Sequence, residues 1–406
     1  MKKNAIIFAT YDGLSTMFSG VGKVSESYIS NFSKFIERYN ATEPDNSFDF
    51  IATDIFYDSQ VHNTERFAKF RMENNFHYIV LPTSAPGTLI NKTWGESVWQ
   101  SASLALATFI GTISTNYNRV IVYCNDTLFM YVRKYLERFS PLTDRISIYW
   151  IPHSLGAFFR DRYTDEQRII SEKNSLAKFV AHTDRIIALN QYAEDVLIKD
   201  YEVPKTLIDR VYNGIKYEQL TGYPVMDKTI FLFGRCTPQK GFDLALPVIL
   251  KFIDSHPYQV TVLAPTETSN LDYITQIETI VTAFPKDKIR LITKFADNEP
   301  IRILSALRNS IVIFASQYET APLAPLEAIL YTHPSVSILY SDIEPHKEIF
   351  DGVVNCYSFP KADPLALFKL LVTQEGYNNN EPRILHERYN FSEALNSHLS
   401  NAINCK

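Results

Sequence analysis

The segment FLFGRCTPQKGFDLAL, residues 231–246, carries two cationic side chains where an apolar run gives way to a helical pattern. Arg235 and Lys240 stand in the connecting loop, and Gly241 directly precedes a helix expected to begin near Phe242. Positive side chains and the N–H groups of a helix N-terminus converge there, and glycine lets the backbone approach a ligand closely. The pattern predicts a diphosphate site, whereas the same segment considered alone also fits a solvated basic loop.

A glycine-bearing loop occupies the corresponding place in the first half of the chain, in MFSGVGKVSES, residues 17–27. Gly20 and Gly22 offer uncovered backbone at the start of a predicted helix, as a phosphate requires. The loop lacks the GxGxxG spacing, and Asp54 lies inside a predicted strand rather than closing it, so a dinucleotide is disfavoured. A lone GxG is a weak signal, and an ordinary tight turn stays open as the alternative. The presence of this matching loop argues against a merely solvated basic loop at residues 231–246.

Two glutamates lie eight positions apart in ASQYETAPLAPLEAILYTHPSVSI, residues 315–338. Glu319 follows a predicted buried strand, and Glu327 belongs to a short helix expected to start near Pro322. Ionised carboxylates accept hydrogen bonds from the paired hydroxyl groups of sugars and ribose. Either glutamate alone fits a surface charge, but the pair in an apolar setting predicts a polyol-binding site.

Short apolar runs alternate with longer amphipathic segments along the whole chain. In the first half, strands are predicted over residues 5–10, 48–55, 78–81, 120–123, 146–151 and 186–189. In the second half, strands are predicted over residues 229–233, 259–264, 289–292, 311–315 and 335–339. Helical patterns separate them, such as residues 23–39 with one apolar face. This alternation predicts α/β architecture, with parallel sheets wrapped by helices and ligands bound at the carboxyl ends of the strands.

The chain divides within residues 213–228, where glycine and proline interrupt any periodic pattern. We expect two doubly wound, Rossmann-like domains facing a central cleft. The first covers residues 1–212, the second covers 213–389, and a C-terminal helix at about 390–406 can pack back on the first domain.

Composition narrows the class of protein. The 406 residues carry 40 Lys and Arg against 45 Asp and Glu, a net charge of −5, which argues against nucleic-acid binding. No apolar run approaches the ~18 residues of a membrane-spanning helix, although peripheral membrane contact stays open. The cysteines lack metal-binding or disulfide spacing, and we expect a cytoplasmic protein with reduced thiols. They are Cys124, Cys236, Cys356 and Cys405.

Taken together, these motifs resemble those of the retaining, nucleotide-sugar-dependent glycosyltransferases of family 4, which have the GT-B fold. The resemblance spans essentially the whole chain and is strongest from about residue 213 to 352. Its most specific element is the E-x7-E pattern that Glu319 and Glu327 form. The motifs are SGVG (19–22), PH (152–153), NGI (213–215), GRCTPQKG (234–241) and ETAPLAPLE (319–327).

The resemblance implies a role for each of these positions. Gly20 and Gly22 would line the donor phosphates from the first domain, and Arg235 with Lys240 would hold the diphosphate from the second. Glu319 would bind hydroxyls of the transferred sugar. The resemblance places the nucleotide ribose at Glu327, a family histidine near the sugar at His153, and backbone beside sugar and phosphate at Ala321, Pro322 and Leu323.

Three stretches depart from the family pattern, and all three concern the donor pocket rather than the reaction class. Residues 320–322 replace a glycine-rich turn, residues 332–334 lack a glycine before the proline, and SDIEPHKEIF (341–350) replaces a double-glycine stretch.

The acceptor is expected to bind in the first domain, whose least regular segment is residues 83–101. Trp94 and Trp99 could stack on a sugar face, although tryptophan more often packs in a core. Asp126 follows a predicted strand and could contact an acceptor hydroxyl or cap a helix instead.

The resemblance therefore implies a retaining hexosyltransferase with His153, Glu319, Arg235 and Lys240 as its catalytic set. The donor would be a UDP- or GDP-linked sugar and the acceptor a glycan, glycolipid or small glycoside, with neither cofactor nor metal required. Two alternatives stay open. One is a relative with other chemistry, either a pseudo-glycosyltransferase or a sugar-nucleotide epimerase; the other is a non-catalytic nucleotide-sugar-binding subunit.

Overall fold

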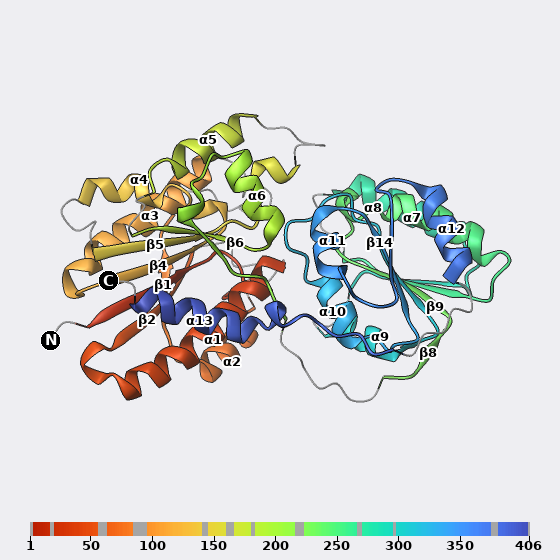
Figure 1. The fold of residues 1–406 in the computed structure, drawn as a ribbon, viewed down its shortest axis with the longest axis horizontal. Helices are drawn as coiled ribbons and strands as arrows, with labels where there is room; N and C mark the ends of the chain where they lie inside the picture. Colours follow the sequence, from red (N-terminus) through yellow and green to blue (C-terminus); the bar gives the residue numbers. More distant parts are fainter. Residues whose placement is uncertain are drawn as a thin grey trace. The chain divides into compact units, whose positions relative to one another are not determined.

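A computed structural model of the chain describes residues 3–16, 20–55, 63–83, 96–139, 145–159, 166–179, 183–215, 223–265, 270–294, 298–374 and 381–404. The chain forms two compact units, shown in Figure 1. The first unit comprises Met1–Asn213 with Phe391–Lys406, and the second comprises Gly214–Asn390.

The first unit is built on a seven-stranded parallel sheet in the order β3-β2-β1-β4-β5-β6-β7. The strands are β1 (Asn4–Ala9), β2 (Phe48–Ile55), β3 (His77–Leu81), β4 (Val120–Asn125), β5 (Ile146–Ile151), β6 (Arg185–Ala188) and β7 (Ile208–Arg210). The strand order reverses between β1 and β4. Loops that follow these two strands leave the sheet in opposite directions, which opens a crevice at their carboxyl ends.

Helices cover both faces of this sheet (Figure 1). They are α1 (Gly20–Thr42), α2 (Thr64–Glu73), α3 (Glu96–Ile113), α4 (Val132–Leu136), α5 (Glu166–Leu176), α6 (Gln191–Lys199) and α13 (Phe391–Asn404). The C-terminal helix α13 packs on α1, with the rings of Tyr28 and Phe391 5.2 Å apart. Arg119 donates hydrogen bonds of 2.8 Å to the carbonyl oxygens of Ile403 and Ala402. These carbonyl groups at the C-terminal end of α13 therefore have partners outside the helix.

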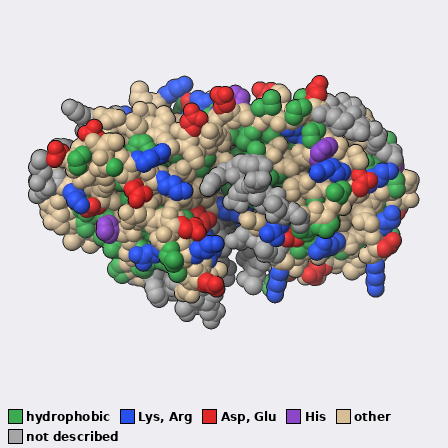
Figure 2. Space-filling view, turned by 90° about the horizontal axis from the view of Figure 1, so that it is seen from below, with side chains coloured by type: hydrophobic (Ala, Val, Ile, Leu, Met, Phe, Trp, Pro, Cys, Tyr) green, Lys and Arg blue, Asp and Glu red, His purple; other side chains and the backbone are tan. Residues whose placement is uncertain are grey.

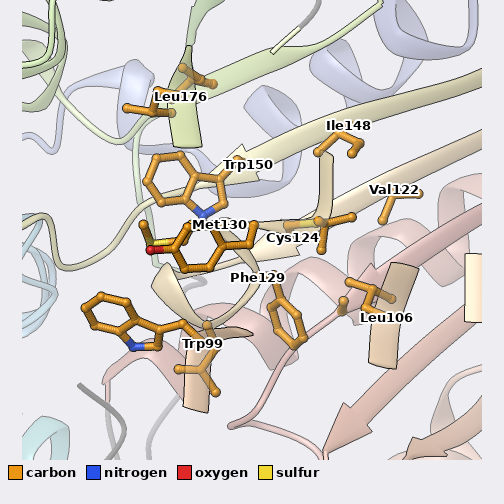
Figure 3. Close-up of a cluster of buried hydrophobic side chains, with 14 of the residues drawn as sticks. Trp99, Leu106, Val122, Cys124, Phe129, Met130, Ile148, Trp150 and Leu176 are labelled. Atoms are coloured by element: carbon orange, nitrogen blue, oxygen red, sulfur yellow. The ribbon is translucent and has the colours of Figure 1, made fainter. Parts of the chain in front are cut away.

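One core of the first unit lies between the sheet and helices α3 to α6. Figure 3 shows Trp99, Phe129 and Trp150 among the aliphatic side chains of this core. Trp150 also donates from its indole nitrogen to the carbonyl oxygen of Asp126, at 2.9 Å. The core therefore fixes the backbone that follows β4, where candidate site residues stand.

The second unit contains a six-stranded parallel sheet in the order β11-β10-β9-β13-β14-β15. Its strands are β9 (Thr229–Phe233), β10 (Gln259–Leu263), β11 (Ile289–Ile292), β13 (Ile311–Phe314), β14 (Ser337–Ser341) and β15 (Cys356–Phe359), and β8 (Met226–Asp227) pairs separately with β12 (Leu307–Arg308). The order reverses between β9 and β13, which pair through Ile311 with Ile230 and Val312 with Phe231.

Helices also flank the second sheet. They are α7 (Phe242–Ile253), α8 (Leu271–Thr282), α9 (Glu299–Ala306), α10 (Ala324–Tyr331), α11 (Glu344–Phe350) and α12 (Pro364–Gln374). Helices α7, α8 and α12 share one core with the sheet. On the opposite face, the ring of Phe314 on β13 lies 5.5 Å from that of Phe233 on β9 and 6.1 Å from that of Phe350 on α11. The predicted fold class, two doubly wound parallel sheets, is confirmed.

The predictions from composition concern the charged surface, the cysteines and the membrane-spanning potential of the helices. On the face in Figure 2, basic and acidic side chains are interspersed rather than gathered into one basic patch. Cys124, Cys236 and Cys356 are free cysteines, and Cys405 lies outside the described residues. Across the described part of the chain, no helix combines the length and apolarity needed to cross a bilayer.

Candidate donor site and the first-unit network

The carboxyl edge of the second sheet brings together the loops after β9 and β13. Arg235 and Lys240 belong to the first loop, which ends in a short 3-10 turn, η10 (Pro238–Lys240). Glu319 belongs to the second loop, five residues beyond β13. Because β9 and β13 are neighbours at the point where the strand order reverses, the two loops meet where doubly wound sheets bind ligands.

Two glycines allow the first loop to pack closely. Gly241 has a φ of +65°, and a Cβ there would lie 2.2 Å from the carbonyl oxygen of Ala315, in the second loop. Gly234 has a φ of +150°, and a Cβ there would lie 3.1 Å from the side-chain stem of Lys240. Any other residue at Gly241 would therefore push the two loops apart.

Glu319 is the centre of the contacts between these loops. Its Oε1 accepts hydrogen bonds from Lys240 Nζ at 2.5 Å and from Ser316 Oγ at 2.7 Å. Its Oε2 accepts from Gln239 Nε2 at 3.2 Å. The side chain of Glu319 is 7% exposed and that of Lys240 is 17% exposed, so this is a largely buried, charge-assisted pair.

The protonation state of Glu319 follows from these partners. Burial acts to raise the pKa of this carboxyl group, but the positive charge of Lys240, together with the hydrogen bonds from Lys240 and Ser316, outweighs it and holds the pKa below its usual value. Glu319 is therefore ionised at neutral pH. It offers a strong acceptor to any donor-rich ligand that reaches it.

Gln239, which no sequence motif singles out, links Arg235 to Glu319 through its side-chain amide. Its side-chain oxygen accepts from Arg235 at 3.3 Å, while its amide nitrogen donates to Glu319 and to the carbonyl oxygen of Tyr318 at 3.0 Å. A glutamine inside a turn carries no sequence signal for such a role. The contact becomes visible only when β9 and β13 are known to be neighbours.

Ser341 and His346, which no sequence motif singles out, stabilise the loop that carries Glu319. Ser341 Oγ donates to the carbonyl oxygen of Ser316 at 2.5 Å, and His346 Nδ1 lies 3.1 Å from the carbonyl oxygen of Ser341. His346 is fully buried on α11, and burial lowers its pKa to about 4, so it is neutral near pH 7. Ser341 and His346 both belong to residues 341–350, one of the stretches that depart from the predicted donor-pocket pattern.

The remaining residues of this unit that the sequence predicts to bind the donor lie just downstream. Pro322 is buried, whereas Ala321 and Leu323 are half-buried in the turn before α10. Glu327 lies in the first turn of α10, is half-buried, and donates from its backbone nitrogen to Leu323 at 2.9 Å. The structure thus brings Lys240 and Glu319 into direct contact and places Glu327 on the helix that follows.

His153 lies in the first unit, in the loop after β5, and is buried. Its Nε2 is 2.9 Å from Asn125 Oδ1; because an amide oxygen only accepts, Nε2 carries the proton in this arrangement. Asn125 Nδ2 in turn donates to Ser25 Oγ at 2.8 Å, on α1. Burial lowers the pKa of His153, so its imidazole is neutral near pH 7.

Asp126 is fully buried at the switch point of the first sheet, with a φ of +71°. Its carboxylate accepts from Tyr11 Oη at 3.0 Å, from the His153 backbone nitrogen at 3.0 Å and from Ser154 Oγ at 2.9 Å. Its side chain makes no capping bond to the 3-10 turn η5 (Thr127–Phe129). Asp126 therefore braces the loop that carries His153, and its contact with an acceptor stays a prediction.

The other predicted residues of this unit divide between surface and core. Gly20 is exposed at the start of α1, and the described residues place nothing within 4 Å of a Cβ there. Gly22 is buried, and its carbonyl oxygen would lie 2.3 Å from a Cβ at Gly13. Trp99 is 2% exposed in the core of Figure 3, which leaves its ring little surface for a sugar.

The last two predictions concern Trp94 and metal binding. Trp94, with most of residues 83–101, lies outside the described residues. Within the residues that are described, no group of three His, Cys, Asp or Glu side chains is arranged to hold a metal ion.

Comparison with known proteins adds information at the level of fold. No family model and no curated protein matches the chain. HepE from Anabaena, solved in complex with UDP and glucose, is 12% identical with a TM-score of 0.61, over 99% of this chain and 96% of that one. Sucrose-phosphate synthase from Thermosynechococcus elongatus is 14% identical with a TM-score of 0.66, over 99% and 95%. Trehalose-6-phosphate synthase OtsA is 10% identical with a TM-score of 0.63, over 98% and 96%.

The TM-scores, over nearly complete chains, establish a shared architecture. Identities of 10–14% show the fold alone. The chain has the GT-B fold of these proteins, as its motifs predict. The assignment to family 4 and the individual site residues stay predictions.

Proposed function

We propose that the chain is a retaining glycosyltransferase, which moves a hexose-type sugar from a UDP- or GDP-linked donor to an acceptor hydroxyl group. The observation that carries the proposal is the contact between Lys240 and Glu319 at the switch point of the second sheet. A cation suited to phosphate and a carboxylate suited to hydroxyl groups stand side by side, as a sugar diphosphate requires. A fold shared with HepE, solved with UDP and glucose, supports the same donor class.

In this proposal each side chain has a distinct part. Arg235 and Lys240 hold the diphosphate, with Gly20 and Gly22 contacting its phosphates from the first unit. Glu319 accepts from hydroxyl groups of the transferred sugar, beside the backbone of Ala321, Pro322 and Leu323. Glu327 holds the ribose.

The reaction needs charge stabilisation more than a protein nucleophile. As the bond to the anomeric carbon breaks, the sugar gains oxocarbenium character and the leaving diphosphate gains negative charge. Arg235 and Lys240 stabilise that charge where it develops. The acceptor hydroxyl group then attacks from the face the diphosphate leaves, and a leaving oxygen takes its proton. We propose that this chemistry requires no metal ion and that His153 lies beside the sugar.

The test is a screen of UDP- and GDP-linked sugars against glycan, glycolipid and glycoside acceptors, read by mass spectrometry and by release of nucleoside diphosphate. We expect a glycosylated product whose anomeric configuration, determined by NMR, matches the donor. Arg235→Ala and Lys240→Ala should each lower turnover by about 10²-fold or more, because each removes a charge-stabilising donor. Near-normal turnover in both variants would refute the assigned diphosphate site.

The same screen separates the alternatives. An epimerase converts the donor without an acceptor, a pseudo-glycosyltransferase releases nucleotide while coupling a group other than a sugar, and a binding subunit retains the donor unchanged. A product with inverted anomeric configuration would contradict the retaining mechanism but not the assignment as a glycosyltransferase.

A further inference from the structure

The Lys240–Glu319 pair bears on how the proposed site distinguishes its donor, a nucleotide sugar, from its product, the free nucleoside diphosphate. Both would contain the same diphosphate, and only the donor carries the sugar. The two residues assigned to those two parts are each other's partners, with Lys240 Nζ 2.5 Å from Glu319 Oε1. Binding at one partner therefore alters what the other partner contacts.

Glu319 depends on Lys240 for its charge. The carboxylate is almost fully buried, and its two other side-chain donors, Ser316 and Gln239, are neutral. A buried carboxylate that loses its cation carries a large free-energy cost. Lys240, by contrast, can exchange a carboxylate for a phosphate oxygen without losing a charged partner.

A bound diphosphate and a bound sugar act on this pair in opposite directions. A diphosphate draws Lys240 away and adds negative charge near Glu319, so diphosphate alone leaves the carboxylate poorly compensated. A sugar attached to the diphosphate presents hydroxyl donors, which restore the hydrogen bonds of Glu319. The penalty thus falls on the nucleoside diphosphate and is relieved in the nucleotide sugar.

We propose that Glu319, through its ion pair with Lys240, makes this site discriminate nucleotide sugar from free nucleoside diphosphate. The inference rests on the proposed function, because it uses the donor site assigned there. It adds that the carboxylate opposes retention of the product, which favours release of the nucleoside diphosphate after sugar transfer.

The test measures the Kd of UDP and UDP-glucose, and of GDP and GDP-mannose, for the full chain by calorimetry. The quantity of interest is the ratio of the nucleoside diphosphate Kd to the nucleotide-sugar Kd. In Glu319→Gln, Lys240 is left to the phosphate alone, so the nucleoside diphosphate should bind more tightly. At the same time the sugar loses a charged acceptor, so the ratio should fall by about tenfold or more.

Two further variants test the physical cause. Glu327→Gln is the matched control: it removes a carboxylate assigned to the ribose, which both ligands share, so both affinities should weaken equally and the ratio should stay constant. Ser316→Ala removes a neutral donor from Glu319 and makes the carboxylate more dependent on Lys240, so the ratio should rise. Circular dichroism confirms that each variant is folded.

The outcomes separate the inference from the function on which it rests. If Glu319→Gln leaves the ratio unchanged, or weakens nucleoside diphosphate binding, the inference is wrong although the donor site stands. If the wild-type chain binds neither nucleotide sugar with a Kd below about 1 mM, the proposed donor site fails, and the inference fails with it.

Discussion

Substitution of Gly241 by alanine tests whether the two loops of the proposed donor site must touch. The new Cβ would lie 2.2 Å from the Ala315 carbonyl oxygen, whereas ordinary contact begins near 3.4 Å, so the loops must separate by about 1.2 Å. The positive φ adds about 1–2 kcal/mol of backbone strain, and overpacking adds about 1–3 kcal/mol. We therefore expect a loss of about 2–5 kcal/mol in the free energy of unfolding.

The matched control for this variant is Gly352→Ala. Gly352 has a similar φ of +70°, but the described residues place nothing within 4 Å of its Cβ, so only the backbone strain of about 1–2 kcal/mol applies. The difference between the two variants isolates the steric contact. For a unit of this size we expect the melting temperature of Gly241→Ala to lie roughly 2–12 °C below that of Gly352→Ala.

The same displacement should impair donor use. Gln317 donates from its backbone nitrogen to the Gln239 carbonyl oxygen at 2.8 Å, so a shift of one loop moves both Gln239 and its neighbour Lys240. A misplacement of about 1 Å can cost about 10²-fold in rate. Calorimetric melting and donor kinetics on both variants provide the measurement. Equal melting temperatures and equal rates in Gly241→Ala and Gly352→Ala would refute the close packing of these loops.

Three further predictions concern charge, backbone access and metal. Lys240→Met should lower the free energy of unfolding most near neutral pH, because it leaves the buried carboxylate of Glu319 without its cation. Without Lys240, burial raises the pKa of Glu319 above its usual 4.5, whereas the pair holds it below that value in wild type. The deficit relative to wild type should therefore begin to narrow above pH 4.5 and continue to narrow below it, as Glu319 protonates first in the variant and then in wild type. Urea titrations from pH 3 to 7 measure this, with the exposed-pair variant Lys347→Met as control; a pH-independent deficit would contradict it. Gly20→Ala should leave stability within about 0.5 kcal/mol but raise the donor KM about tenfold, because the described residues place nothing within 4 Å of that Cβ and the proposed phosphate would meet it. An unchanged KM would remove Gly20 from the proposed site. Activity should survive excess EDTA, and loss that Mn²⁺ or Mg²⁺ restores would contradict metal independence.

Apolar periodicity was sufficient to predict most of the sheet. The predicted strands 48–55, 146–151 and 229–233 coincide with β2, β5 and β9, because short, predominantly apolar runs mark strands that are buried on both faces. The prediction of 335–339 for β14 began and ended two residues too early, because the strand spans Ser337–Ser341. Residues before Ser337 form a turn instead, in which Val336 donates to the carbonyl oxygen of His333 at 3.0 Å. Strand β15 escaped prediction because most of it is only partly buried and lacks a clear apolar run.

The candidate site was predictable only where residue type alone indicates chemistry. Arg235, Lys240 and Glu319 could be identified as charges at strand ends, and Glu319 does meet Lys240. Gln239 and Ser316 could not, because their importance comes from pairing between β9 and β13, strands separated by about 80 residues. Neutral polar residues in loops carry no periodic signal, so their partners become known only from the three-dimensional register.

The central claim is that Lys240 binds the donor diphosphate while Glu319 binds the sugar. A crystal structure of the full chain with an intact nucleotide sugar tests it most directly. We predict phosphate oxygens within hydrogen-bonding distance of Arg235 and Lys240, and a sugar hydroxyl group donating to Glu319. A diphosphate bound away from both cations, or a sugar that leaves Glu319 in contact with Lys240 alone, would contradict the account.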